Sequence, residues 1–175
     1  LPRILRELGA EVVSIAVTPD GFNINEECGS TKPEKAQKAV LENCADIGIC
    51  LDGDADRVLF IDEQGKLANG DQVIGLLARA WMEKNSLNKS TVVATVMSNL
   101  ALEQYLDKIG VRLIRTQVGD KNVSKCMNRE GLNLGGEQSG HLILSDYSNA
   151  GDGLITSLQV LSVLVESKKK ASGVF

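Results

Sequence analysis

Apolar residues recur along the chain in two patterns, a helical spacing of three and four residues and shorter runs rich in β-branched side chains. Val73, Ile74, Leu77 and Trp81 show the helical spacing, whereas residues 91–97 are mostly β-branched and predict a central strand. In chain order, helices are predicted at residues 2–8, 31–43, 71–84, 99–109, 120–129 and from 153 onward. Strands are predicted at residues 11–17, 46–51, 58–61, 91–97, 111–117 and, with a glycine-rich interruption, 132–144.

This alternation of helices and strands is typical of an α/β protein. Local signals support it: Thr31 is expected to cap a helix, with Pro33 in the first turn and Glu34 completing a capping box. The pattern restarts after a turn, so we predict two consecutive α/β units, residues 1–67 and 68–175.

The composition narrows the functional classes. The 175 residues are 43% hydrophobic and carry 19 basic and 23 acidic side chains, a net charge of −4. This balance gives no basic surface for nucleic acid, no apolar run of about 18 residues indicates a membrane span, and no signal-peptide pattern is present. The four cysteines show no C-x-x-C spacing, so we expect reduced thiols in a cytoplasmic protein rather than a zinc site. Because the chain opens in a helix without an initiator Met, we expect it to be part of a longer protein.

An acidic loop, residues 52–57, directly follows the strand predicted at 46–51. Side chains at alternate positions of an extended chain point the same way, so Asp52, Asp54 and Asp56 are expected to converge. Three converging carboxylates favour a hard divalent cation, and Mg²⁺ is the usual one where phosphates are handled. Arg57 then places a positive fork beside the ion, suited to a phosphate group.

Three other interpretations of the acidic loop compete. An EF-hand is excluded because Arg57 stands at the sixth position, where glycine is required, and strands flank the loop. An aspartyl phosphatase also places such acids after a buried strand, with Asp52 as nucleophile and Asp54 as acid, and this interpretation stays open. A solvated acidic turn would not require three aligned acids followed by an arginine.

A glycine-rich loop, residues 135–141, combines bare backbone with three hydrogen-bonding side chains. Gly136 and its neighbours allow a ligand to approach the main chain, Glu137 can accept hydrogen bonds from two sugar hydroxyls, and Ser139 can donate or accept. A tight hairpin turn explains the pattern equally well. His141 is expected to be a structural hydrogen-bonding residue rather than a catalyst.

A third loop, residues 118–121, lies at a strand-to-helix junction, and we call it the helix-start loop. Its amide groups and Lys121 can meet a phosphate, although Asp120 acting as an ordinary helix cap accounts for the sequence equally well. Residues 151–153 are interpreted as the start of the last helix.

These loops, in this order, resemble the α-D-phosphohexomutase superfamily. The matching segments run through the whole chain: GFNIN at 21–25, GSTKP at 29–33, DGDADR at 52–57, NGDQ at 69–72, VMSN at 96–99, VGDK at 118–121, GGEQSGH at 135–141 and AGDG at 150–153. DGDADR and GGEQSGH are highly specific in combination. The form of the second motif, together with residues 23–25, is similar to the bacterial phosphoglucosamine mutase branch.

The resemblance implies the middle of a four-domain enzyme, most of the second domain and essentially all of the third, each with a mixed sheet. It implies interconversion of glucosamine 6-phosphate and glucosamine 1-phosphate with Mg²⁺, through a phosphoserine and a 1,6-bisphosphate. The implied roles are metal ligation by Asp52, Asp54 and Asp56, phosphate contact by Arg57, sugar recognition by Gly136, Glu137, Ser139 and His141, and proximity to the site for Asp120 and Lys121.

Two departures from the family pattern matter for function. Lys121-Asn122 replaces the usual Arg-Tyr, which keeps the charge but loses bidentate geometry. The phosphoserine loop and the phosphate loop of the fourth domain have no counterpart in these 175 residues, so the first and fourth domains are expected partners.

The open alternatives are a phosphomannomutase or phosphoglucomutase, the aspartyl phosphatase, and a non-catalytic sugar-phosphate binding module.

Overall fold

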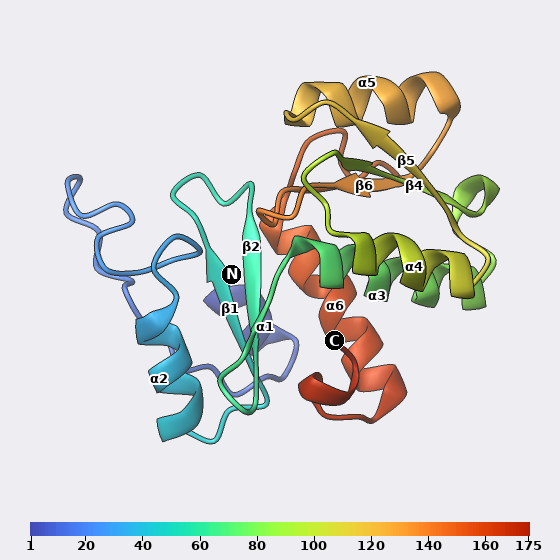
Figure 1. Ribbon diagram of the computed structural model, residues 1–175. Helices are drawn as coiled ribbons and strands as arrows, with labels where there is room; N and C mark the ends of the chain where they lie inside the picture. The colour runs from blue at the N-terminus through green and yellow to red at the C-terminus, as the bar shows by residue number, and fades with distance from the viewer.

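A three-stranded antiparallel sheet organises the first part of the chain (Figure 1). The structure, a computed structural model, describes all 175 residues. Helices α1 (Pro2–Glu7) and α2 (Glu34–Glu42) precede the strands β1 (Ile47–Leu51), β2 (Val58–Asp62) and β3 (Leu67–Ala68). The strands lie in the order β1-β2-β3, and both pairs are antiparallel, so this sheet is not mixed as the resemblance implied.

A four-stranded mixed sheet organises the rest of the chain, in the order β5-β4-β6-β7. β4 (Thr91–Thr95) pairs in parallel with β5 (Arg112–Thr116) and β6 (Leu134–Gly136), and β7 (Leu142–Leu144) is antiparallel to β6. The helices are α3 (Gly70–Glu83), α4 (Leu100–Lys108), α5 (Asp120–Glu130) and α6 (Gly153–Ser167), with short 3-10 turns η1 (Asn88–Ser90) and η2 (Ala171–Gly173).

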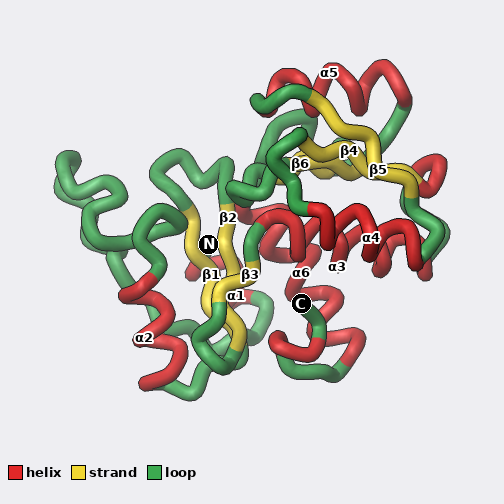
Figure 2. Tube along the Cα trace, in the orientation of Figure 1, coloured by secondary structure: helices red, strands yellow, loops and turns green.

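Helices cover both faces of this second sheet, α5 on one side and α3 with α4 on the other (Figures 1 and 2). β4 shows why: Val92 and Ala94 belong to the large core that includes α3 and α4, whereas Val93 packs with Val123 and Met127 of α5. Because alternate side chains of a strand point to opposite faces, a strand covered on both sides is apolar throughout. The central strand predicted at residues 91–97 is confirmed, but it ends at Thr95, and Val96 and Met97 are exposed beyond it.

The large core crosses from one sheet to the other. Val58 and Phe60 of β2 are fully buried in the same cluster as residues of α3, α4 and α6. The end of the chain returns to this region, where the rings of Phe60 and Phe175 lie 5.8 Å apart. The two sheets are therefore parts of one packed body.

Side-chain caps fix the starts of three helices. Asn69 and Gln72 form a reciprocal capping box at α3, Asn99 accepts from the N–H of Leu102 at α4, and Asp152 accepts from the N–H of Ile155 at α6. The starts predicted near residues 99 and 153 are confirmed.

Residues 11–17 do not form the predicted strand. Ile15 packs against the small cluster around Val40 and Ile61, whereas Val13 and Val17 are exposed. β1 is bonded to β2 alone, so no neighbouring strand pairs with this segment. An extended segment becomes a strand only through ladder hydrogen bonds to a partner, and its own apolar pattern cannot supply them.

The predicted capping box at Thr31 is also wrong. The N–H of Lys32 donates to the carbonyl of Gly29, which places Thr31 inside a turn, and the helix begins later, with Pro33 as N-cap residue and no side-chain cap. Sequence spacing alone does not distinguish a cap from a turn that precedes the helix.

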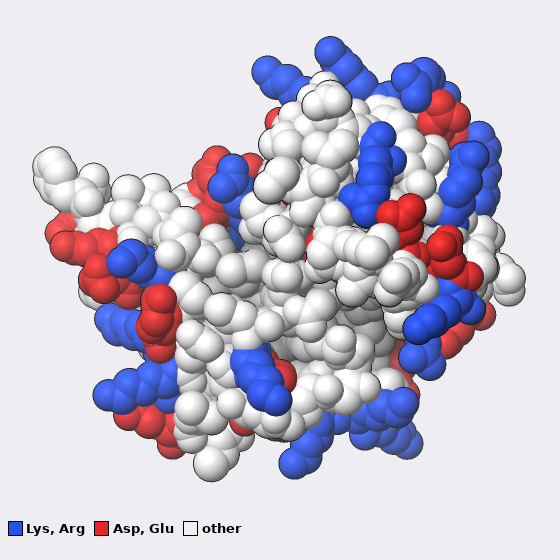
Figure 3. Space-filling view, in the orientation of Figure 1, with Lys and Arg blue, Asp and Glu red and all other residues white.

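The surface carries charges of both signs. Figure 3 shows Lys and Arg side chains interspersed with Asp and Glu on the face in view, without a continuous basic area. None of the helices combines the length and the apolar character needed to cross a membrane.

The first residue of α3, Gly70, lies directly under the glycine-rich loop. A Cβ built on Gly70 would stand 2.0 Å from the carbonyl oxygen of Glu137 and 2.9 Å from the nitrogen of Gly140. We therefore expect Gly70→Ala to lower the free energy of unfolding by about 1–3 kcal/mol, the typical effect of overpacking. Urea denaturation measures this loss, and Gly173→Ala, with no atom within 4 Å of the added carbon, is the matched control. Equal stability of the two variants would contradict the contact.

Candidate functional site

The acidic loop brings its three carboxylates together at the junction of β1 and β2. One oxygen from each of Asp52, Asp54 and Asp56 can be chosen so that all lie within 4.8 Å of one another. The convergence predicted from the sequence is present, but its cause is different. The loop is a tight turn in which the N–H of Ala55 donates to the carbonyl of Asp52, and Ala55 has a φ of +60°. The turn, and not an extended chain, aligns the side chains.

The carboxylates have too little compensation for their charge. Arg57 is the only positively charged residue of the acidic loop. Its Nε lies 3.8 Å from Asp52 Oδ2 and 3.8 Å from Asp56 Oδ1, distances too long for hydrogen bonds. Asp56 Oδ1 is buried without a hydrogen-bond partner. Burial, followed by the neighbouring carboxyl group of Asp52, raises the pKa of Asp56. A buried, unpartnered carboxylate oxygen among three acids is what a hard cation would satisfy, so the residues fit Mg²⁺.

The glycine-rich loop is the turn of the β6–β7 hairpin. The N–H of Gly140 donates to the carbonyl of Glu137, and the N–H of Glu137 donates to the carbonyl of His141. Gly140 has a φ of +94°, which favours glycine. Gly136 is buried in β6, where an added Cβ would lie 2.7 Å from the carbonyl oxygen of His141. The hairpin-turn interpretation therefore describes the backbone of this loop correctly.

The glycine-rich loop lies against the acidic loop although about 80 residues separate them in sequence. The N–H of Val58 donates to the carbonyl of Gly140, and Arg57 and His141 form an isolated antiparallel bridge. His141 Nδ1 is 3.0 Å from Asp56 Oδ2, and the His141 side chain is only 7% exposed. The structure thus supports the prediction of a structural hydrogen-bonding role for His141.

Glu137 joins the glycine-rich loop to the helix-start loop. Its Oε1 accepts from the N–H of Gly119 at 3.0 Å, which leaves the other carboxylate oxygen for a ligand. Ser139 is exposed at the tip of the turn. The two side chains that the sequence singles out in this loop are therefore accessible, and Glu137 is also anchored.

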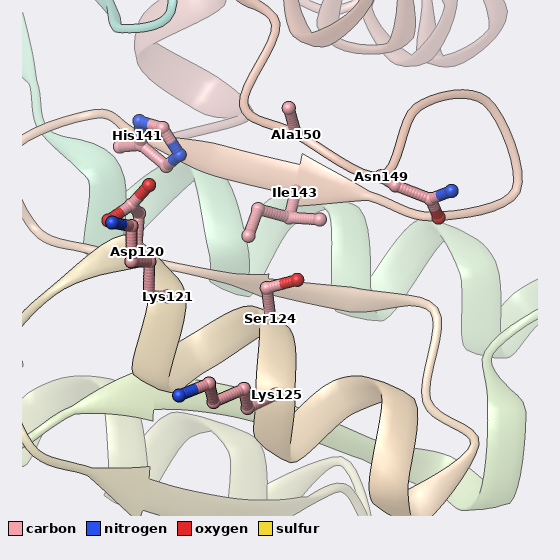
Figure 4. Close-up of a pocket in the computed structure, with 8 residues that line it drawn as sticks. All are labelled: Asp120, Lys121, Ser124, Lys125, His141, Ile143, Asn149 and Ala150. Carbon is pink, nitrogen blue, oxygen red and sulfur yellow. The ribbon is translucent and has the colours of Figure 1, made fainter.

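Asp120 and Lys121 lie across a small cavity from His141 (Figure 4). The N-cap residue of α5 is Gly119, without a side-chain cap bond, so the interpretation of Asp120 as an ordinary helix cap is wrong. The cavity of about 280 Å³ is lined by Asp120, Lys121, Ser124, Lys125, His141, Ile143, Asn149 and Ala150. Sequence reasoning missed Ser124 and Lys125, although they stand three and four residues after Lys121 on one helix face.

Comparisons with known proteins identify the family of this chain. Residues 1–65 match the family model "Phosphoglucomutase/phosphomannomutase, alpha/beta/alpha domain II", and residues 69–175 match the corresponding domain III. The chain belongs to the phosphoglucomutase/phosphomannomutase family.

A curated relative, the phosphoglucosamine mutase of Parvibaculum lavamentivorans, is 58% identical over 171 residues. The match covers 98% of this chain and 38% of that relative, so the chain spans well under half the length of the curated relatives. A solved structure of a phosphoglucomutase/phosphomannomutase family protein from Burkholderia thailandensis aligns with a TM-score of 0.84 at 26% identity, covering 94% of this chain and 36% of that one. Aspergillus fumigatus N-acetylphosphoglucosamine mutase, solved with GlcNAc-6P and magnesium, shares the fold, with a TM-score of 0.65 at 20% identity over 86% of this chain and 36% of that one.

Membership of the phosphoglucomutase/phosphomannomutase family favours the metal-site interpretation of the acidic loop over the phosphatase interpretation. An aspartyl phosphatase would use Asp52 as a nucleophile, whereas here Asp52 Oδ1 accepts from the N–H of Arg57 and its side chain is only 10% exposed. The acidic loop is therefore better described as a candidate metal site than as a nucleophile with its acid partner.

Asp54 is the exposed member of the three acids, so its replacement tests the metal site without disturbing the core. We expect Asp54→Asn to weaken Mg²⁺ or Mn²⁺ binding by at least about tenfold, because residues that merely orient ligands already contribute 10–100-fold. Calorimetric titration of the metal measures the change. Asp107→Asn, on the exposed surface of α4, removes the same charge elsewhere and should bind as the unchanged protein does. Unaltered affinity in Asp54→Asn would reject the metal site.

Proposed function

We propose that this chain supplies the metal loop and the sugar-recognition loop of a phosphoglucosamine mutase. The observation that carries the proposal is the contact between the acidic loop and the glycine-rich loop, through His141 and Asp56. It places three carboxylates suited to a divalent ion beside side chains suited to a sugar. The identity of 58% with a relative of that name supports the hexosamine substrate.

In the proposed reaction, phosphate moves between the 6- and 1-positions of glucosamine phosphate through a 1,6-bisphosphate. Asp52, Asp54 and Asp56 would hold Mg²⁺, which when bound supplies neutralising charge to a transferring phosphoryl group. Arg57, half exposed beside the acids, would contact the phosphate. The positions of these groups matter most, since phosphoryl transfer depends on positioning and charge neutralisation.

Substrate recognition is assigned to the glycine-rich loop and the cavity beside it. The free oxygen of Glu137 and the exposed Ser139 would bind sugar hydroxyls, while Gly136 and His141 shape the loop from below. Lys121 and Asp120 line the cavity at the start of α5. Lys125, one turn further along the same face of α5, adds a second positive charge to the cavity.

The first and fourth domains of the full-length enzyme are proposed as partners, because they carry the phosphoserine and a phosphate loop in the family that the sequence resembles. The boundary between the second and third domains is proposed at residues 67 and 68, within β3. We assign the enzyme to the cytoplasm on the basis of its four free thiols.

The substrate preference can be tested directly on the full-length enzyme. Turnover should be fastest with glucosamine 6-phosphate and slower with mannose 6-phosphate and glucose 6-phosphate, each assayed with its 1,6-bisphosphate and Mg²⁺. A higher kcat/KM for either neutral sugar would replace the proposed function with a phosphomannomutase or phosphoglucomutase.

Glu137→Ala should separate sugar binding from metal binding in the full-length enzyme. Asp56 of the acidic loop contacts His141, whereas Glu137 accepts a hydrogen bond from Gly119. Removal of the Glu137 carboxylate therefore leaves the contact between Asp56 and His141 in place. We expect kcat/KM for glucosamine 6-phosphate to fall by more than about tenfold, with Mg²⁺ affinity unchanged in calorimetry. Glu42→Ala, on the exposed surface of α2, is the control. Equal losses of sugar and metal affinity would show that Glu137 does not act on the sugar alone.

The isolated 175-residue chain is expected to show no mutase turnover. Three carboxylates leave an octahedral Mg²⁺ ion half satisfied, and the proposed phosphate donor lies in another domain. When some of the groups that position the substrate are missing, the rate falls by more than the fraction of groups removed, because positioning supplies most of the rate enhancement. A coupled assay for glucosamine 1-phosphate, with a trace of the bisphosphate, measures this. Turnover on the order of 1 per second or above would mean that the chemistry resides in this chain.

A further inference from the structure

Gly151 lies directly against the ring of His141. A Cβ built on Gly151 would stand 2.4 Å from both Cε1 and Nε2 of His141, and 2.8 Å from Nδ1. Favourable contact between carbon atoms requires about 3.5–4.0 Å. Gly151 is not among the residues with positive φ, so an alanine could adopt its backbone conformation. The three atoms nearest to the added carbon all belong to the His141 ring, which therefore opposes a side chain at this position.

The His141 ring has little freedom to move aside. The residue is 6% exposed, and its carbonyl accepts from the N–H of Glu137 at 2.9 Å, which fixes the main chain. Its Nδ1 lies 3.0 Å from Asp56 Oδ2, and its Nε2 is buried without a partner. We therefore expect a displacement of the ring that makes room for a methyl group on Gly151 to disrupt the contact with Asp56.

The same segment also supports the acidic loop directly. The N–H of Gly153 donates to the carbonyl of Ala55 at 2.8 Å, the residue whose left-handed conformation forms the turn. Residues 151–153 thus support the acidic loop in two ways: Gly151 packs against the His141 ring, which contacts Asp56, and the Gly153 backbone bonds to Ala55.

We propose that Gly151 is a positioning residue for the metal site: by leaving room for the His141 ring, it keeps Nδ1 on Asp56 and so holds the acidic loop in its cation-binding shape. We call this chain of contacts, from Gly151 through the His141 ring to Asp56, the steric relay. The nature of the ion rests on the proposed function, whereas the steric relay does not. Partners that orient metal ligands typically contribute 10–100-fold to metal affinity, and this is the effect expected of the relay.

Mn²⁺ binding to the full-length enzyme, followed by electron paramagnetic resonance, tests the relay. Gly151→Ala should weaken Mn²⁺ binding by about 10–100-fold, whereas Gly173→Ala, with open space around the added carbon, should not. If Gly151 acts through the ring, Gly151→Ala should have no further effect in a His141→Ala background. Wild-type affinity in Gly151→Ala, or the same loss in both backgrounds, would overturn the proposal.

A suppressor variant keeps the test decisive if Gly151→Ala folds poorly. Asparagine at position 141 can still donate a hydrogen bond but has no ring to collide with Gly151. We expect the double variant Gly151→Ala/His141→Asn to unfold at a higher temperature than Gly151→Ala alone. No such rescue would mean that the ring is not the obstacle.

A measurement without metal separates this proposal from the proposed function. His141 is the only histidine of the 175 residues, so its ring signals in the ¹⁵N-labelled chain need no further assignment. A slowly exchanging Nδ1–H proton is expected in the unchanged chain and should be lost in Gly151→Ala, and its retention in that variant would reject the relay. If the signal is lost as expected but the full-length enzyme binds no Mn²⁺, the metal assignment fails and the relay stands.

Discussion

Three carboxylates within 4.8 Å of one another repel, and the fold must hold them together before any cation binds. The restraint comes from the other sheet, through the hydrogen bond between His141 and Asp56 and the bond from Gly153 to Ala55. The acidic loop therefore does not owe its shape to its own strands alone. The continuous core that contains both β2 and α3 keeps the two sides at a fixed distance.

This arrangement links three loops that lie far apart in the sequence. The glycine-rich loop contacts the acidic loop through His141 and the helix-start loop through Glu137 and Gly119. The cavity beside His141 is lined by Lys121 and Lys125 of α5, so the hairpin residue His141 contacts both the three acids and a cavity with two lysines. A phosphorylated sugar needs positive charge to bind its phosphate groups and hydrogen-bond acceptors to bind its hydroxyl groups.

The close approach of these loops depends on positions without side chains. At Gly70 an added carbon would meet the backbone of the glycine-rich loop, and at Gly151 it would meet the ring of His141. In the sequence, both residues are simply glycines near the starts of helices, where glycine is common. Their partners are remote in sequence, and only packing shows why a larger residue would not fit.

Several features followed from local chemistry and were predictable: the helices with apolar periodicity, the buried central strand β4, and the helix starts near Asn99 and Asp152. The convergence of Asp52, Asp54 and Asp56 was also predicted, although a tight turn and not an extended chain produces it. These depend on residues close in sequence, whose side chains set the local conformation. Residues 11–17 were mispredicted because a strand requires a partner. The bond between His141 and Asp56 and the cavity lined by Lys121 and Lys125 were decided by tertiary structure alone. They are contacts between segments that only the packed fold brings within a few ångströms, and no local pattern specifies such a distance.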